Sequence, residues 1–281
     1  QQASRLNDNG SFPYLRSHPM TTERISDAQA RQQLLPVRGP VATTATHAMM
    51  SARAQVLVKP GVDVLRAIAA QADTATLASA TKAKQAGTLY GAAMAEMHQR
   101  NFSAARQYLS RLQAINGLDV GAARVVRLLA AELALSAGDA MQSVNLLEPK
   151  VGVLASTDRA TRMQLAQSRL ATHKPAQGKQ AASELSLWLN QHPRDASAWL
   201  LQASAFELQG NALRAIRAQA EARAMELDYG AAVDRFKAAQ TLAHQLDSEG
   251  KLDSAGHVEA SIIDARLREL EKWRREQALE R

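Results

Sequence analysis

The chain has 281 residues, of which 46% are hydrophobic and 22% charged, and its net charge is +7. This composition excludes a disordered chain, and the length is sufficient to bury a substantial core. The absence of cysteine excludes a disulfide scaffold and a thiolate zinc site. No apolar run in the sequence reaches the roughly 18 residues of a membrane span. Alanine and leucine dominate and favour helix, so we expect an all-α protein.

The first 40 residues differ from the rest because proline and glycine recur in them. We expect residues 1–40 to be a tail or linker from an upstream domain, with one short helix from Thr22 to Leu35 that ends before Pro36. Residues 41–281 are expected to form the main domain. Its first three predicted helices are Thr43–Val58, Val62–Gln71 and Ala75–Ala86.

From residue 86 onward the pattern predicts about five units, each a helix, a tight turn and a second helix. The fourth unit is the clearest, with a bulky aromatic residue, small residues and a glycine turn at Trp199, Ala203, Phe206, Gly210, Asn211, Ala215 and Ala222. These spacings are typical of the tetratricopeptide repeat. Small residues let two helices cross closely, and Gly210 can adopt the positive φ that ends a helix.

The other units match the pattern less strictly. Their turns are expected near residues 101, 139, 177, 211 and 251, where a repeat of 34 residues is typical. The last helix, about Ser254 to Ala278, is highly charged in its C-terminal half, which favours a polar cap on the array; a charged partner-binding helix is the alternative. We therefore predict a right-handed α-solenoid of antiparallel helix hairpins.

Stacked units of this kind leave a concave groove lined by the first helix of each pair. Counting from each turn predicts the lining residues, which are Tyr90, Met94, Met97, His98, Val125, Leu128, Glu132, Leu135, Ser197, Leu200, Ser204 and Glu207. Leu128 and Leu200 fit a core position equally well. A groove this mixed in polarity favours extended or unfolded client segments. Replacing Tyr90, Met94 and Met97 together is expected to weaken partner binding without loss of helicity.

Recognisable catalytic motifs are missing from the sequence. None of the seven histidines begins a His-Glu-x-x-His helix, and there is neither a phosphate-binding glycine loop nor a Gly-x-Ser-x-Gly elbow. We therefore expect no catalysis by this chain and no cofactor in it. Arginines are spread through nearly every helix and are interpreted as solvated faces. A compact basic run with interleaved aromatic residues is lacking, so no nucleic-acid partner is expected.

One segment resembles a known family. Tyr14-Leu15-Arg16-Ser17-His18-Pro19, followed by Glu23-Arg24-Ile25, is similar to the segment after the catalytic domain in BepA-like (YfgC-like) periplasmic zinc metalloproteases of peptidase family M forty-eight. The resemblance implies a parent zinc protease in the periplasm. It also implies that the repeats recruit outer-membrane protein clients or the β-barrel assembly machinery for quality control.

The same resemblance assigns a role to His18. In those enzymes the histidine of the His-Pro segment lies near the catalytic zinc and can act as an extra, inhibitory ligand. The usual two histidines and glutamate that bind zinc are absent here, so His18 would reach a metal only in the full-length protease. Two alternatives remain, a free-standing scaffold without a linked enzyme and a helical-repeat RNA binder. The second is disfavoured because the first-helix residues differ from unit to unit.

Overall fold

The computed structural model describes residues 21–33, 42–58, 61–149 and 158–279. The chain divides into two units at Thr43, and each is considered by itself. Over the described residues, thirteen α-helices and two 3₁₀ turns account for all regular structure, which confirms the all-α prediction. The first unit contains α1 (Thr21–Gln33), near the expected short helix. The resemblance segment around His18 lies outside the described residues.

The second unit begins with α2 (Ala45–Leu57) and α3 (Val62–Ala70), close to the predicted bounds. The predicted helix Ala75–Ala86 is wrong as far as Thr81, and only its last residues, from Lys82 onward, are helical. Two 3₁₀ turns, η2 (Gln71–Asp73) and η3 (Ala75–Leu77), occupy the region before α4 (Lys82–His98). Hydroxyl groups bond to nearby carbonyls in this stretch, Thr74 to Gln71 and Ser79 to Thr76. Such local bonds compete with helix formation.

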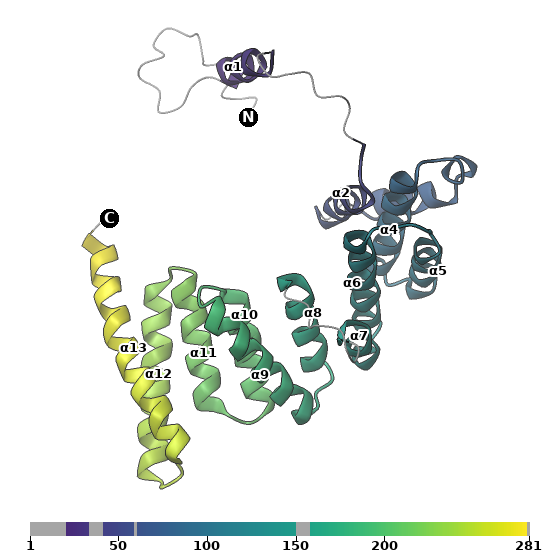
Figure 1. The fold of residues 1–281 in the computed structure, drawn as a ribbon. Coiled ribbons are helices and arrows are strands. Elements are labelled where there is room, and N and C mark those ends of the chain that lie inside the picture. Colours follow the sequence, from purple (N-terminus) through teal and green to yellow (C-terminus); the bar gives the residue numbers. More distant parts are fainter. Residues whose placement is uncertain (1–20, 34–41, 59–60, 150–157, 280–281) are drawn as a thin grey trace. The chain divides into compact units, whose positions relative to one another are not determined.

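From α4 onward, each helix packs on the next one along the chain. Figure 1 shows α11, α12 and α13 as neighbouring antiparallel helices. After α4, the bounds are α5 (Phe102–Gln113), α6 (Val120–Ser136), α7 (Ala140–Leu147), α8 (Arg159–Leu170), α9 (Pro175–Gln191), α10 (Ala196–Leu208), α11 (Ala212–Met225), α12 (Tyr229–Ser248) and α13 (Ser254–Leu279).

One turn geometry recurs at five helix ends. In each, the backbone N–H of the second residue after the C-cap donates to the carbonyl five residues earlier, at 2.8 to 3.1 Å. These donor residues are Asn101, Asp139, Asn211, Asp228 and Lys251. The residue before each has positive φ, and these are Arg100, Gly138, Gly210, Leu227 and Gly250. This is the Schellman motif, which satisfies carbonyls left unpaired at a helix end. In the first four cases the Asn or Asp side chain also caps the next helix.

The third turn differs from the prediction. It was expected near residue 177, but α9 already begins at Pro175. Proline suits the first helical position because its fixed φ is helical and its missing N–H is not needed there. Gly178 therefore lies within the helix, where a Cβ would come 3.0 Å from the Leu208 side chain of α10. The residue with positive φ in this turn is His173.

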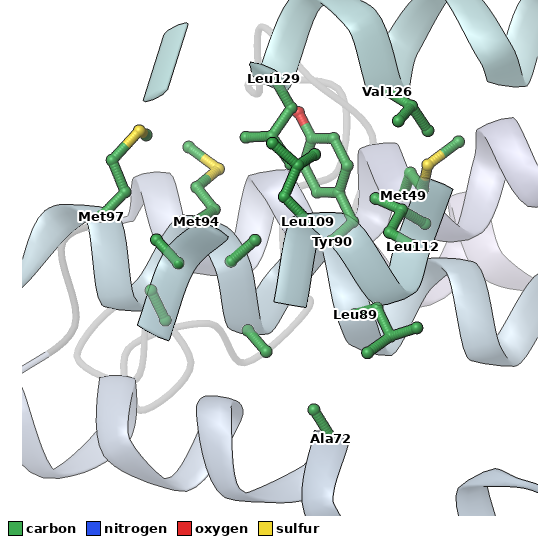
Figure 2. Close-up of a cluster of buried hydrophobic side chains, with 14 of the residues drawn as sticks. Met49, Ala72, Leu89, Tyr90, Met94, Met97, Leu109, Leu112, Val126 and Leu129 are labelled. Atoms are coloured by element: carbon green, nitrogen blue, oxygen red, sulfur yellow. The ribbon is translucent and has the colours of Figure 1, made fainter. Parts of the chain in front are cut away.

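Two hydrophobic clusters dominate the core. The larger joins α2 through α6, and Figure 2 shows it around Tyr90, with Leu112 from α5 and Leu129 from α6. The second joins α11, α12 and α13 through side chains that include Phe236 and Ile263. Between them, α9, α10 and α11 meet through small residues, as the sequence pattern predicts for close crossings, with Ala181, Ala182, Ala203, Ala205, Ala215 and Ala218 all buried.

Polar contacts connect α6 and α7 to the helices that follow residue 157. The hydroxyls of Ser143 and Ser168 lie 2.7 Å apart, both buried. The Arg169 guanidinium, which has no exposed surface, donates to Glu148 at 2.9 Å and to Glu184 at 2.6 Å. Removing either carboxylate would leave a buried cation less well compensated, so these pairs fix how the helices meet.

The interpretation of the arginines as solvated faces is wrong for several of them. Arg217 pairs with Glu259, and Arg266 donates to Glu221 at 2.7 and 2.9 Å; both carboxylates are buried. These pairs join α11 to α13. Each tryptophan ring also has a guanidinium 5.6 Å from its centre, in the pairs Arg162–Trp188, Arg217–Trp199 and Arg266–Trp273.

The Schellman turns yield a stability prediction. Leu227 has a φ of +63°, so its backbone is strained, and it is 62% exposed, so its side chain contributes little burial. Leu227→Gly should stabilise the protein by about 0.5–1 kcal/mol, because glycine tolerates positive φ. Gly210→Leu should destabilise it by roughly 1–2 kcal/mol, since φ is +73° there while a Cβ would meet nothing within 4 Å. Urea unfolding followed by circular dichroism measures both; equal shifts in the same direction would contradict the strain argument.

Candidate partner-binding surface

The predicted groove residues of α10 lie on one exposed face. Ser197, Leu200, Ser204 and Glu207 are all exposed, and Leu200 keeps 43% of its surface in contact with solvent. Their spacing of three and four residues places them on one side of a helix. The opposite side of α10 is buried through residues that include Phe206. This face therefore offers one apolar side chain flanked by hydroxyls and a carboxylate.

Two side-chain hydrogen bonds connect this face to α11 and α12. Glu207 accepts a hydrogen bond from the Gln219 side chain of α11 at 2.7 Å. Gln219 in turn accepts one from Arg235 of α12 at 3.0 Å. Both hydrogen bonds lie at the exposed surface, although Gln219 itself is half-buried, so each contributes little to stability. These hydrogen bonds give the α10 face a polar edge.

The predicted groove residues of α4 are not on a surface. Tyr90, Met94 and Met97 are buried, with exposures of 1%, 0% and 6%, whereas His98 is exposed. Figure 2 shows Tyr90, Met94 and Met97 in a row on one side of α4. Because they are core residues, they do not contact a partner in this structure, and the expected triple replacement would remove core packing instead of a binding surface.

The predicted residues of α6 are partly covered. Val125 is buried, and Leu128, Glu132 and Leu135 are half-buried. The side chain of Gln164 in α8 donates to the Leu128 carbonyl at 2.8 Å. Glu132 accepts two hydrogen bonds from Arg53 of α2, at 2.7 and 3.2 Å.

The same Arg53 guanidinium reaches α4. It donates to the Tyr90 hydroxyl at 3.1 Å and lies 3.9 Å from the Met94 sulfur. Burial raises the pKa of Tyr90 above its ordinary value, so the phenol keeps its proton. The structure thus brings the predicted residues of α4 and α6 together beneath α2, and leaves those of α10 open.

One polar cluster beside the α10 face is not predicted by the groove pattern. Asp195 caps α10 by accepting from the Ala198 N–H at 3.2 Å. Its carboxylate also accepts two bonds of 2.7 Å from Arg159 and one of 3.0 Å from the Trp188 indole. These donors hold the pKa of Asp195 down at about 2, the Arg159 bonds contributing most. An aspartate directly before a helix is the sequence signal of such a cap.

The Asp195 cluster borders an open hollow on the surface. The hollow has a volume of about 710 Å³, and its lining includes Trp188, His192, Asp195 and Ser197. The Trp188 and His192 rings lie with their centres 3.8 Å apart. Since Ser197 belongs to both, the hollow continues the α10 face toward α9.

Among residues 21–33, 42–58, 61–149 and 158–279, no group of three or more His, Asp or Glu side chains is arranged to hold a metal ion. His18, the predicted metal-linked residue, lies outside these ranges. None of the helices in the described part of the chain is both long and apolar enough to cross a membrane.

Comparison with known proteins gives no family. No protein-family model matches the chain, and a search of curated proteins finds no match in sequence.

The burial of the α4 residues can be tested directly. Met94→Ala should cost about 2–5 kcal/mol of unfolding free energy, because it leaves a cavity in a packed core. Met50→Ala is the matched control, since Met50 is 38% exposed on α2 and should change stability by about 0.5 kcal/mol or less. Chemical denaturation reports both values. A Met94 variant as stable as the control would contradict the core assignment.

The Asp195 cluster predicts acid sensitivity. Its folded-state pKa of about 2 is below the ordinary 3.8, so the ionised carboxylate stabilises the protein above pH 3.8 and this contribution disappears as the pH falls toward 2. The shift corresponds to about 2 kcal/mol. Asp195→Asn should therefore be less stable than the unchanged protein at pH 5, with a gap that narrows by about that amount at pH 2. Asp63→Asn, at a side chain 97% exposed, should show no such narrowing.

Proposed function

We propose that residues 41–281 form a protein-interaction module of stacked tetratricopeptide hairpins, arranged as a right-handed solenoid. Three features support this. The Schellman turn recurs at five helix ends. Successive helices pack on one another in chain order. Small residues fill the crossings of α9, α10 and α11, which is how hairpins of this class pack closely.

The exposed face of α10 is the partner-binding surface in this proposal. Leu200 presents an apolar side chain to solvent between Ser197 and Ser204, and Glu207 ends the same stripe. An extended client segment has unpaired backbone N–H and C=O groups as well as apolar side chains. Hydroxyls can donate to or accept from such a backbone, and the leucine can contact the side chains. We assign this face to extended or unfolded protein segments.

The N-terminal segment supplies the biological setting of the proposal. The residues around His18 and Pro19 resemble those that follow the catalytic domain of BepA-like proteases. On this basis the module belongs to a periplasmic zinc metalloprotease and recruits outer-membrane clients or the β-barrel assembly machinery. In this proposal, catalysis and zinc belong to the parent protease. The repeats contribute only the binding of substrates.

A charged replacement on α10 tests the assignment. Leu200→Asp should weaken binding of an unfolded outer-membrane β-barrel protein, diluted from urea and fluorescently labelled, by about tenfold, which corresponds to about 1.4 kcal/mol. The reason is that the apolar contact is lost and a carboxylate must be desolvated. Fluorescence anisotropy measures the dissociation constant.

The control for this test is Leu187→Asp, at a leucine of α9 that is 63% exposed. Both variants carry the same change in charge and remove an exposed leucine, so a general loss of surface hydrophobicity affects them equally. If the two variants bind the client with the same affinity, α10 is not the contact face.

A further inference from the structure

The turn between α5 and α6 contains the dipeptide Asn116–Gly117. Both residues are exposed, and Gly117 has a φ of +78°. When glycine follows asparagine, the backbone nitrogen of the glycine can approach the carbonyl carbon of the asparagine side chain, because there is no Cβ to obstruct it. The turn therefore holds both partners of an intramolecular reaction side by side in the sequence.

The two reacting groups of this turn are not held by other parts of the described chain. Neither the Asn116 side chain nor the Gly117 N–H makes a hydrogen bond to a described residue. The other described asparagines differ in this respect. Asn101 and Asn211 accept hydrogen bonds as helix caps, and the two asparagines within α7 and α9 precede residues whose N–H groups belong to the helix. Asn116 is thus placed in the most reactive setting among the asparagines that the structure describes.

A lysine lies beside the same turn. The Nζ atom of Lys82 lies 3.1 Å from the position that a Cβ on Gly117 would occupy. Lys82 and Asn116 also line one open hollow of about 650 Å³. A positive charge at this place favours loss of the Gly117 amide proton, and it stabilises the negative oxygen that forms when the nitrogen attacks a carbonyl.

We propose that Asn116 is a site of spontaneous deamidation that Lys82 promotes. The Gly117 nitrogen bonds to the side-chain carbonyl carbon of Asn116, and its proton leaves with the side-chain nitrogen as ammonia, which closes a succinimide ring. Water then opens the ring at one of its two carbonyls. Opening at the side-chain carbonyl gives aspartate, and opening at the backbone carbonyl gives isoaspartate. No oxidant or reductant is consumed, and the inference is independent of the proposed function.

Either product changes the turn between α5 and α6. A carboxylate replaces a neutral amide beside Lys82. Isoaspartate also lengthens the backbone by one carbon between Ile115 and Leu118, which flank the dipeptide and pack against the larger hydrophobic cluster. Packed interiors tolerate little change in the spacing of such anchors, so the isoaspartate form should unfold at lower urea concentration than the unchanged chain.

The experiment ages the full, folded chain at neutral pH and body temperature and follows its tryptic peptides by mass spectrometry. Cleavage after Arg111 and Arg124 isolates Asn116 in peptide 112–124, which should gain one mass unit. An isoaspartate-specific carboxyl methyltransferase should transfer a methyl group from S-adenosylmethionine to the same peptide. Asn9–Gly10 has the same dipeptide sequence and is the internal reference.

Two matched variants test the part played by the lysine. Lys82→Gln should slow the conversion of Asn116 by about fivefold, the effect of a unit charge a few ångströms away in water, and should leave Asn9 unchanged. Lys84→Gln makes the same change in charge at an exposed position of α4 and should not alter either rate. Asn116→Gln should abolish the gain of mass in this peptide, because the longer side chain would have to close a larger ring.

Three results would overturn the proposal. The first is an unchanged Asn116 at the time when half of Asn9 has converted. The second is conversion of Asn116 in urea but not in the folded chain, which would show that the native turn blocks the reaction. The third is equal conversion of Asn116 in the Lys82→Gln and Lys84→Gln variants, which would remove the lysine from the site.

Discussion

The close approach of neighbouring helices is the constraint on which this structure depends. Where helices cross, alanine or glycine replaces larger residues, as at Ala203 and Ala215 between α10 and α11 and at Gly87 between α2 and α4. Helices that approach this closely bury backbone as well as side chains, and interiors packed at this density tolerate little change in volume. Small side chains contribute little burial individually, so ion pairs such as Arg266–Glu221 orient helices that alanine alone would leave free to slide.

Local signals in the sequence predict several of the helix ends and turns. Gly210 and Asn211 mark the turn between α10 and α11, and the helix-ending His192-Pro193 lies just after α9. The late start of α4 was missed because Thr74, Thr76 and Ser79 bond to each other or to nearby backbone. The start of α9 was missed because Pro175 begins a helix here instead of interrupting one. Local chemistry decides both boundaries: hydroxyl hydrogen bonds delay the start of α4, and the fixed φ of proline suits the start of α9.

The candidate site was predictable only in part. Counting from the turn groups the α10 residues on one side of the helix, but it leaves Leu200 open between core and groove, and only the structure shows that this side is exposed. For α4 the same spacing identified a stripe, but the sequence does not show that α2 covers it. That contact joins Arg53 to Glu132, 79 residues apart, and no periodic pattern encodes such a pairing. An alanine stripe on α2 and a glycine stripe on α4 are complementary, yet each is compatible with many other partners.

The three tryptophans with a neighbouring arginine are intrinsic fluorescence probes of the helix junctions. Trp188, Trp199 and Trp273 each have a guanidinium near the ring, and each lies at a different helix junction, in α9, α10 and α13. Indole emission shifts in wavelength and intensity when a neighbouring charge moves or water enters. Variants that keep one tryptophan at a time would thus resolve the order in which successive junctions separate, without any attached dye.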